Sequence, residues 1–159
     1  MIRSLVLYAE ILTQKIYRKG SSMKTVIITG SREYRNTSGI KKVMLALCTE
    51  LGSYRFVHGA AKGADSIGAF IYTNVMHQKE IQEYPAKWDK YGQAAGSIRN
   101  REMLDTELTK NAREDILVIA FPMSRSIGTY HMIHYAQKCN VQVRIYNQEG
   151  EQIHATTDT

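Results

Sequence analysis

Three short segments of the chain combine glycine with groups that bind anions: Gly30-Ser31-Arg32, residues 59–63 and residues 122–128. Glycine has no Cβ, so the backbone can turn sharply there and an outside group can come close to it. The second segment precedes a predicted helix, whose free N–H groups suit a phosphate or carboxylate, and Lys62 adds a full positive charge. The alternative is a tight strand–helix turn that binds no ligand, with Asp65 as a partner of the helix dipole.

The other two segments carry further donors. In the first, the Arg32 guanidinium can close over an anion held by backbone N–H groups, the alternative being an exposed loop arginine. In the third, Gly128-Thr129 opens a predicted helix with N–H groups and a hydroxyl. Ser124 and Ser126 are either additional donors or plain turn residues.

Arg99 is expected in the first turn of a helix capped by Ser97, where a positive charge opposes the helix dipole. Local rules disfavour an arginine there, so a bound anion or an acidic neighbour is the expected explanation. The alternative is a surface arginine.

Aromatic and histidine side chains offer other chemistry. Trp88 or Tyr91, in a long predicted loop, can stack on a base, the alternative being that Trp88 holds that loop on the core. His131 and His134 are spaced as a ligand pair on a helix, but no third ligand is evident, so no metal site is predicted. His58, at a strand end, either contacts a ligand or is structural. No nucleophilic triad, P-loop or GxGxxG fingerprint is found.

These residues must be positioned by alternating strands and helices. The predicted strands are residues 25–29, 56–58, 79–84, 116–121 and 141–145, and the predicted helices are residues 40–51, 64–75, 97–108 and 128–139. This alternation predicts a Rossmann-like α/β three-layer sandwich with a mainly parallel sheet of five strands or slightly more. Ligands in such folds lie beyond the carboxyl ends of the strands, where all three glycine segments fall.

Length and composition set the remaining limits. The 159 residues suffice for one domain, and the net charge of +6 favours anionic partners. We expect an N-terminal, helical extension at 1–22, a domain at 23–146 and a polar, frayed tail at 147–159. Residues 5–12 are apolar but too short to span a bilayer and have no cleavage site after them, and the two cysteines lack metal spacing. These features predict a cytoplasmic protein with no membrane partner.

Several motifs resemble those of the YspA/YpsA-related branch of the SLOG superfamily. They are Val26-Ile27-Ile28-Thr29-Gly30-Ser31-Arg32, His58-Gly59-Ala60-Ala61-Lys62-Gly63-Ala64-Asp65, Trp88 with Tyr91-Gly92, Ala95-Gly96, Arg99-Asn100-Arg101-Glu102-Met103, Ala120-Phe121-Pro122 and Gly128-Thr129. They occur in the family's order over residues 24–145. The resemblance implies a Rossmann-like, commonly oligomeric protein that binds a nucleotide or nucleotide-derived ligand.

Relatives within that superfamily leave three alternatives open. Lonely Guy phosphoribohydrolases carry PGGxGTxxE, to which Gly128-Thr129 is similar, but Met132 stands where the catalytic Glu would be. Hydrolysis of an N-glycosidic bond would then depend on Arg99 and Asp65. The DNA-processing protein A family implies single-stranded nucleic-acid binding, yet no basic stripe is visible here. Some defence-system SLOG domains imply a sensor or sequestering module for an ADP-ribose-type signal.

The sequence and the resemblance together predict a nucleotide-binding site at the strand ends, with no other cofactor. The expected ligand-binding residues are Gly30, Ser31, Arg32, His58, Gly59, Ala60, Ala61, Lys62, Gly63, Asp65, Trp88, Arg99, Asn100, Ser126, Gly128 and Thr129. The phosphate is expected on residues 59–63 and Gly128-Thr129, between Arg32 and Arg99, with Asp65 orienting a ribose hydroxyl or water. We expect a homo-oligomer.

Overall fold

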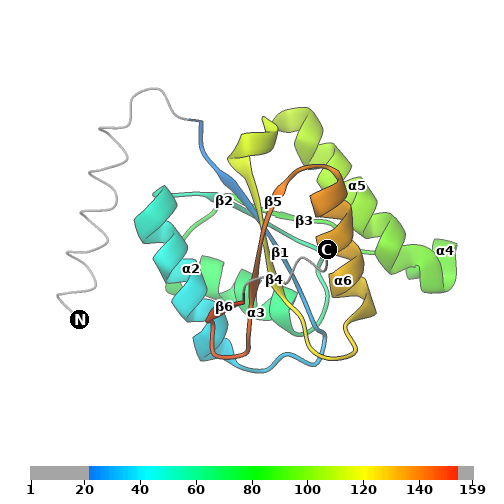
Figure 1. Ribbon diagram of the computed structural model, residues 1–159, viewed down its shortest axis with the longest axis horizontal. Coiled ribbons are helices and arrows are strands. Elements are labelled where there is room, and N and C mark those ends of the chain that lie inside the picture. Colours follow the sequence, from blue (N-terminus) through cyan, green and yellow to red (C-terminus); the bar gives the residue numbers. More distant parts are fainter. Residues whose placement is uncertain (1–21, 154–159) are drawn as a thin grey trace.

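A computed structural model describes residues 22–153, which contain one six-stranded sheet between two layers of helices (Figure 1). The strands are β1 (Thr25–Gly30), β2 (Arg55–His58), β3 (Ile81–Glu83), β4 (Ile116–Phe121), β5 (Gln142–Tyr146) and β6 (Gln152–Ile153). Their order across the sheet is β3-β2-β1-β4-β5-β6, and only the β5–β6 pair is antiparallel.

The centre of the sheet is the β1–β4 pair. Both strands are apolar, β-branched runs that are buried along almost their whole length, as expected for strands covered on both faces. They pair in parallel from Thr25 with Ile116 to Gly30 with Phe121. The chain adds β2 and β3 on one side of β1 and then crosses to β4 on the other. The strand order therefore reverses between β1 and β4, where parallel sheets open a crevice.

Two helices cover each face of the sheet. One face is covered by α2 (Thr37–Leu51) and by α3 (Ala64–Phe70), which continues as the π-helical segment η1 (Ile71–Val75). The other face is covered by α5 (Ala95–Lys110) and α6 (Ile127–Lys138). The predicted three-layer α/β sandwich is thus confirmed at the level of strand alternation, parallel pairing and layers.

The ends of the helices agree with the sequence in some places and differ from it in others. Asn36 caps the start of α2 by accepting a hydrogen bond from Gly39 N at 3.3 Å, and Gly52 ends α2 with a φ of +76°. The prediction that Ser97 caps the next helix is wrong, because α5 begins at Ala95 and Ser97 Oγ donates back to Ala94 O. The expected loop before it contains short helices α4 (Trp88–Tyr91) and η2 (Gly92–Ala94), and η3 (Arg113–Asp115) precedes β4.

The end of the domain also differs from expectation. Residues 147–153 are not a frayed tail, because they form a hairpin in which β6 pairs with β5. Tyr34 Oη and Asn36 Nδ2 donate to Gln148 O at 2.9 and 2.7 Å and hold this hairpin beside the start of α2. The expected extension lies outside the described residues except for Ser22, as do residues 154–159.

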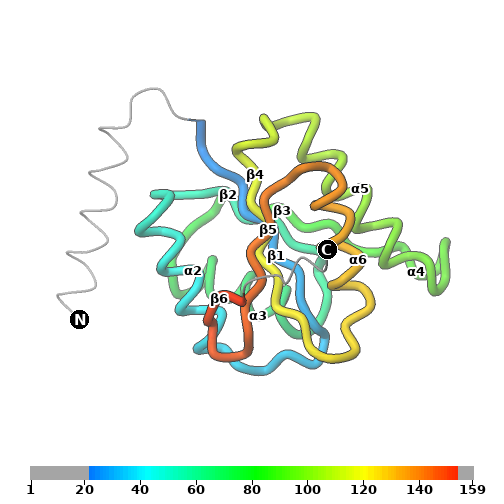
Figure 2. The backbone as a smooth tube through the Cα atoms, viewed as in Figure 1, coloured from blue at the N-terminus to red at the C-terminus, as the bar shows by residue number. Residues whose placement is uncertain are grey.

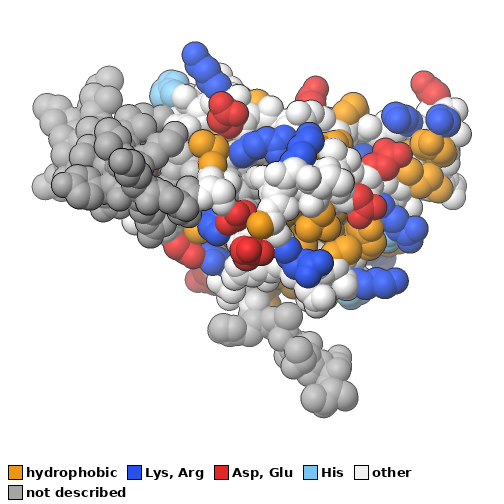
Figure 3. Space-filling model, turned by 90° about the horizontal axis from the view of Figure 1, so that it is seen from above, with side chains coloured by type: hydrophobic (Ala, Val, Ile, Leu, Met, Phe, Trp, Pro, Cys, Tyr) orange, Lys and Arg blue, Asp and Glu red, His pale blue; other side chains and the backbone are white. Residues whose placement is uncertain are grey.

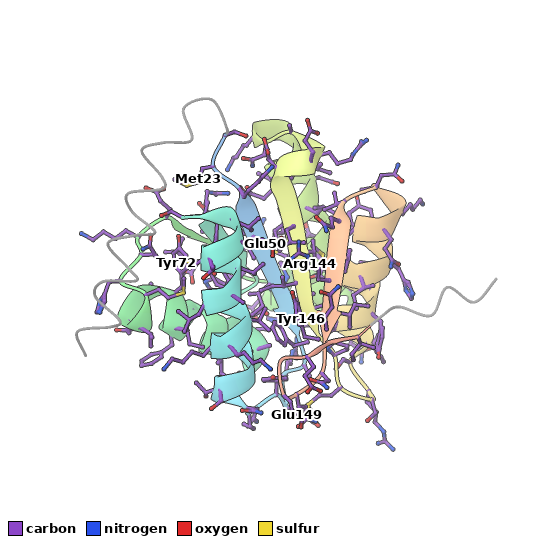
Figure 4. All side chains as sticks on the ribbon, turned by 60° about the vertical axis from the view of Figure 1, so that its left-hand side comes forward. Met23, Glu50, Tyr72, Arg144, Tyr146 and Glu149 are labelled. Atoms are coloured by element: carbon purple, nitrogen blue, oxygen red, sulfur yellow. The ribbon has the colours of Figure 1, made fainter. Side chains whose placement is uncertain are left out.

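One ion pair ties β5 to the neighbouring helix layer. Arg144 on β5 donates to both carboxylate oxygens of Glu50 on α2 at 2.8 and 2.7 Å (Figure 4). Two parallel hydrogen bonds give this pair a fixed geometry. None of the helices within residues 22–153 has the length and hydropathy of a membrane span.

Candidate functional site

A pocket of about 520 Å³ opens at the carboxyl ends of β1 and β4. The connections that follow these two strands both lie at the lower edge of the molecule in Figure 2. The pocket walls come from residues 28–33, from residues 123–129, from Trp88 and the start of α5, and from Asp65 with Ala61. The geometric expectation that the glycine segments meet at one edge of the sheet is therefore confirmed.

Most of the expected site residues line this pocket. Those that do are Gly30, Ser31, Arg32, Ala61, Asp65, Trp88, Arg99, Asn100, Ser126, Gly128 and Thr129. Those outside the lining are His58, Gly59, Ala60, Lys62 and Gly63. Lining residues that the sequence reasoning left out include Thr29, Gln93, Gly96, Arg125 and His131. Gly96 belongs to the Ala95-Gly96 motif, a signal that could have identified it, whereas Gln93 lies in a segment expected to be a loop and has no such signal.

The turn at residues 59–63 uses its own groups to satisfy its backbone. Asp65 Oδ2 accepts hydrogen bonds from Gly59 N at 3.0 Å and from Ala61 N at 3.3 Å. Ala60 N donates to His58 Nδ1 at 3.0 Å, and the Arg99 guanidinium donates to Gly59 O. The carboxylate of Asp65 thus occupies the position in which the sequence analysis expected a phosphate.

Glycine is required in this turn for packing rather than for an approaching ligand. A Cβ at Gly63 would collide with the carbonyl oxygen of Ser31, and the φ of Gly63 is +78°. A Cβ at Gly59 would overlap the Arg99 guanidinium, and one at Gly30 would overlap Ala64 Cβ. These three glycines let the turn, α5 and α3 lie against one another.

Asp65 and Arg99 form the electrostatic centre of this closed turn. Burial raises the pKa of the Asp65 carboxyl to about 6, while the nearby Arg99 charge and the two N–H groups act in the opposite direction. Burial also lowers the pKa of Arg99, which the charge of Asp65 partly offsets. Of the two explanations expected for Arg99, the structure contains the acidic neighbour. Arg99 also donates to Tyr84 O at 3.2 Å.

The start of α6 presents the opposite situation. The N–H groups of Gly128 and Thr129 have no hydrogen-bond acceptor among residues 22–153. A Cβ at Gly128 would meet no atom within 4 Å, so this glycine faces open space in the pocket wall. Asn100 Nδ2 donates to Gly128 O at 3.1 Å, and Ser126 Oγ accepts from Met123 N at 2.8 Å. These bonds fix the loop and leave its N–H groups available.

An arginine and an indole ring face each other at another part of the wall. The Arg32 guanidinium carbon lies 4.8 Å from the centroid of the Trp88 ring, within the range of a cation–π contact. Trp88 is 45% exposed, so it does not anchor its segment in the core. Nearby, His131 lines the pocket, and its buried Nδ1 has no partner among the described residues.

The pocket has neither a group of metal ligands within residues 22–153 nor a carboxylate at position 132. Within residues 22–153, no three His, Cys, Asp or Glu side chains are grouped to hold a metal ion. Met132 is fully buried and packs in the core between the sheet and α6, away from the pocket lining. Position 132 therefore places no functional group in the pocket.

Comparison with known proteins finds a relative that covers most of the chain. The chain is 36% identical over 129 residues to the Gene 61 protein of Mycobacterium phage D29, and the match covers 76% of this chain and 94% of that protein. That name states no ligand, reaction or partner. No family model and no solved structure matches the chain.

Proposed function

This chain belongs to the family of the Gene 61 protein of Mycobacterium phage D29, and we propose that it binds a nucleotide or nucleotide-derived ligand in the pocket between β1 and β4. The observation that carries the proposal is the position of the pocket at the point where strand order reverses. Parallel α/β sheets bind ligands at this point. The resemblance to the SLOG superfamily implies the same class of ligand.

The phosphate position is proposed at the start of α6. The N–H groups of Gly128 and Thr129 have no acceptor within residues 22–153, and together with the positive end of the helix dipole they favour an anion there. Arg32 and Arg125 line the same pocket and supply positive charge. We do not propose a phosphate on residues 59–63, because Asp65 already accepts from the amides of Gly59 and Ala61.

The pocket fits a protein that binds the nucleotide better than one that also hydrolyses its N-glycosidic bond. Such hydrolysis passes through an oxocarbenium-like transition state that is assisted by carboxylates. Asp65 is the buried acid of the pocket, and its Oδ2 is already engaged by two N–H groups. The other acid of the lining, Glu33, is exposed, and the core position of Met132 supplies none.

The surface charges also favour a small ligand over a single-stranded nucleic acid. On the pocket lining itself, the arginines Arg32, Arg99 and Arg125 accompany the acids Glu33 and Asp65. Figure 3 shows the opposite end of the molecule, where Lys and Arg side chains also lie interspersed with Asp and Glu side chains. Nucleic-acid binding usually uses a continuous basic groove. The net charge of +6 alone does not create such a groove.

Calorimetric titration with a panel of nucleoside mono- and diphosphates tests the proposal. We expect at least one nucleotide to bind, and Gly128→Ala to weaken that binding about tenfold because its methyl group occupies the phosphate position. The ligand-free variant should fold normally, since space for the methyl is open. A panel in which no nucleotide binds would contradict the proposal, and chromatographic detection of free base would add hydrolysis to it.

A further inference from the structure

We propose that Arg32 has two alternative positions: over the Trp88 ring when the pocket is empty, and on the phosphate when a nucleotide is bound. The base of the ligand then takes the place of the guanidinium on the indole. This inference rests on the proposed function and identifies the ligand as one that carries both a planar base and a phosphate.

Hydrogen bonds hold the backbone around Arg32 in place, whereas its side chain has few contacts. Ser31 O accepts from Tyr34 N and Ala64 N, both at 3.2 Å, and Arg35 donates to Arg32 O at 2.8 Å. The Arg32 side chain itself is exposed and forms no ion pair within residues 22–153. Its contact with the Trp88 ring is therefore one that a stronger partner can replace.

The exposed Trp88 ring offers a surface on which a base can stack. It lies on the four-residue helix α4, and a Cβ at Gly96 would come within 3.5 Å of its Cη2, so one edge rests beside α5. Gln93 and Ser97 line the same pocket as Trp88 and offer an amide and a hydroxyl to the edge of a base. An exposed indole beside hydrogen-bonding groups is a surface on which bases stack.

The exchange is favourable because each group gains a better partner. A guanidinium binds a phosphate through parallel, charge-assisted hydrogen bonds, which are stronger than its contact with an exposed ring. The indole stays covered, since a base replaces the guanidinium on it. One pocket contains both Trp88 and the unpaired N–H groups of Gly128 and Thr129, so a single ligand can satisfy all of them.

Calorimetry with three matched probes separates the two ends of the ligand. The probes are the nucleoside 5′-monophosphate that binds tightest, its nucleoside, and ribose 5-phosphate. Arg32→Ala should lower the affinity for the monophosphate and for ribose 5-phosphate about tenfold. The same variant should bind the nucleoside about 2- to 5-fold more tightly, because it removes a cation that competes for the ring.

The reciprocal variant should show the reciprocal pattern. Trp88→Ala should lower the affinity for the monophosphate and for the nucleoside about 10- to 100-fold, because the base loses its stacking partner. It should bind ribose 5-phosphate slightly more tightly, because Arg32 is no longer held over the ring. Arg113→Ala is the matched control, since it removes one exposed arginine in η3, outside the pocket lining, and should leave all three affinities unchanged.

Fluorescence gives an independent measurement, because Trp88 is the only tryptophan of the 159-residue chain. Its emission should change in ligand-free Arg32→Ala and should be quenched by the monophosphate in the wild-type protein.

Two results distinguish failure of this inference from failure of the proposed function. The wild-type protein could bind the monophosphate while Arg32→Ala binds the nucleoside no more tightly than the wild-type protein does. In that case the proposed movement of Arg32 is wrong, and the proposal of nucleotide binding stands. If no nucleotide binds the wild-type protein, both are wrong.

Discussion

The segment at residues 59–63 and the segment at residues 122–128 look alike in sequence but differ in what occupies them. Both follow a buried strand, contain glycine and lead into a helix, α3 after the first and α6 after the second. In the first turn, Asp65 and Arg99 bind the backbone groups, whereas in the second the N–H groups of Gly128 and Thr129 remain unpaired within the described part of the chain. An acidic residue shortly after a glycine turn can therefore mark a turn that is already filled.

The largest effect should come from the packing glycine of the closed turn. Gly63→Ala places a methyl against the Ser31 carbonyl in a backbone conformation that suits glycine, so we expect a loss of about 3 kcal/mol or more. Chemical denaturation measures this free energy of unfolding. A loss below about 1 kcal/mol would mean that the turn is looser than the contacts of Gly63 imply.

A smaller loss is expected when the internal carboxylate is removed. Asp65→Ala leaves the N–H groups of Gly59 and Ala61 without their acceptor, which should cost about 2–3 kcal/mol. Asp65→Asn keeps one oxygen in place and is the matched control for volume and hydrogen bonding. If Asp65→Ala is as stable as Asp65→Asn, a side-chain oxygen at position 65 does not hold the turn.

The same carboxyl should make stability depend on pH. Burial raises the folded-state pKa of Asp65 from 3.8 to about 6, so between these values the folded protein holds a proton that the unfolded chain releases. The stabilisation is present below the unfolded pKa and is lost as pH rises through about 6. We expect the wild-type protein to lose on the order of 2 kcal/mol relative to Asp65→Asn between about pH 4 and pH 7. Denaturation curves at several pH values measure the difference, and parallel curves for the two proteins would contradict it.

The smallest effect on stability is expected in the open turn. Gly128→Ala adds a methyl to free space inside a helix, so its free energy of unfolding should stay within about 0.5 kcal/mol or rise slightly. Thermal denaturation without ligand measures it. A loss as large as that of Gly63→Ala would remove the distinction between the two turns.

The sequence predicted the layers and the location of the site well, because these depend on patterns with a direct physical cause. The β-branched runs of β1 and β4 identify buried parallel strands, and parallel strands bring their carboxyl ends together. It was less successful for α4, since a four-residue helix leaves no periodic signal. It also missed the β6 hairpin, which is held by contacts of Gln148 with residues more than 100 positions earlier.

The contacts inside the closed turn at residues 59–63 could not be predicted from local sequence. Lys62 and Gly63 were expected to face a ligand, but whether a side chain lines the pocket depends on how the turn folds back on Ser31. The contact of Arg32 with Trp88 joins residues 56 positions apart and has no local signature. Such pairings are set by packing across the whole fold.

The short hairpin after β5 has a consequence for handling this protein. Strand edges with unpaired N–H and C=O groups promote aggregation, and natural proteins blunt them with very short strands and turns. Here β6 pairs with Ile145 and Tyr146, so within residues 22–153 it covers part of the sheet margin. A chain cut after Tyr146 would expose that margin and should precipitate more readily than one that keeps residues 147–153.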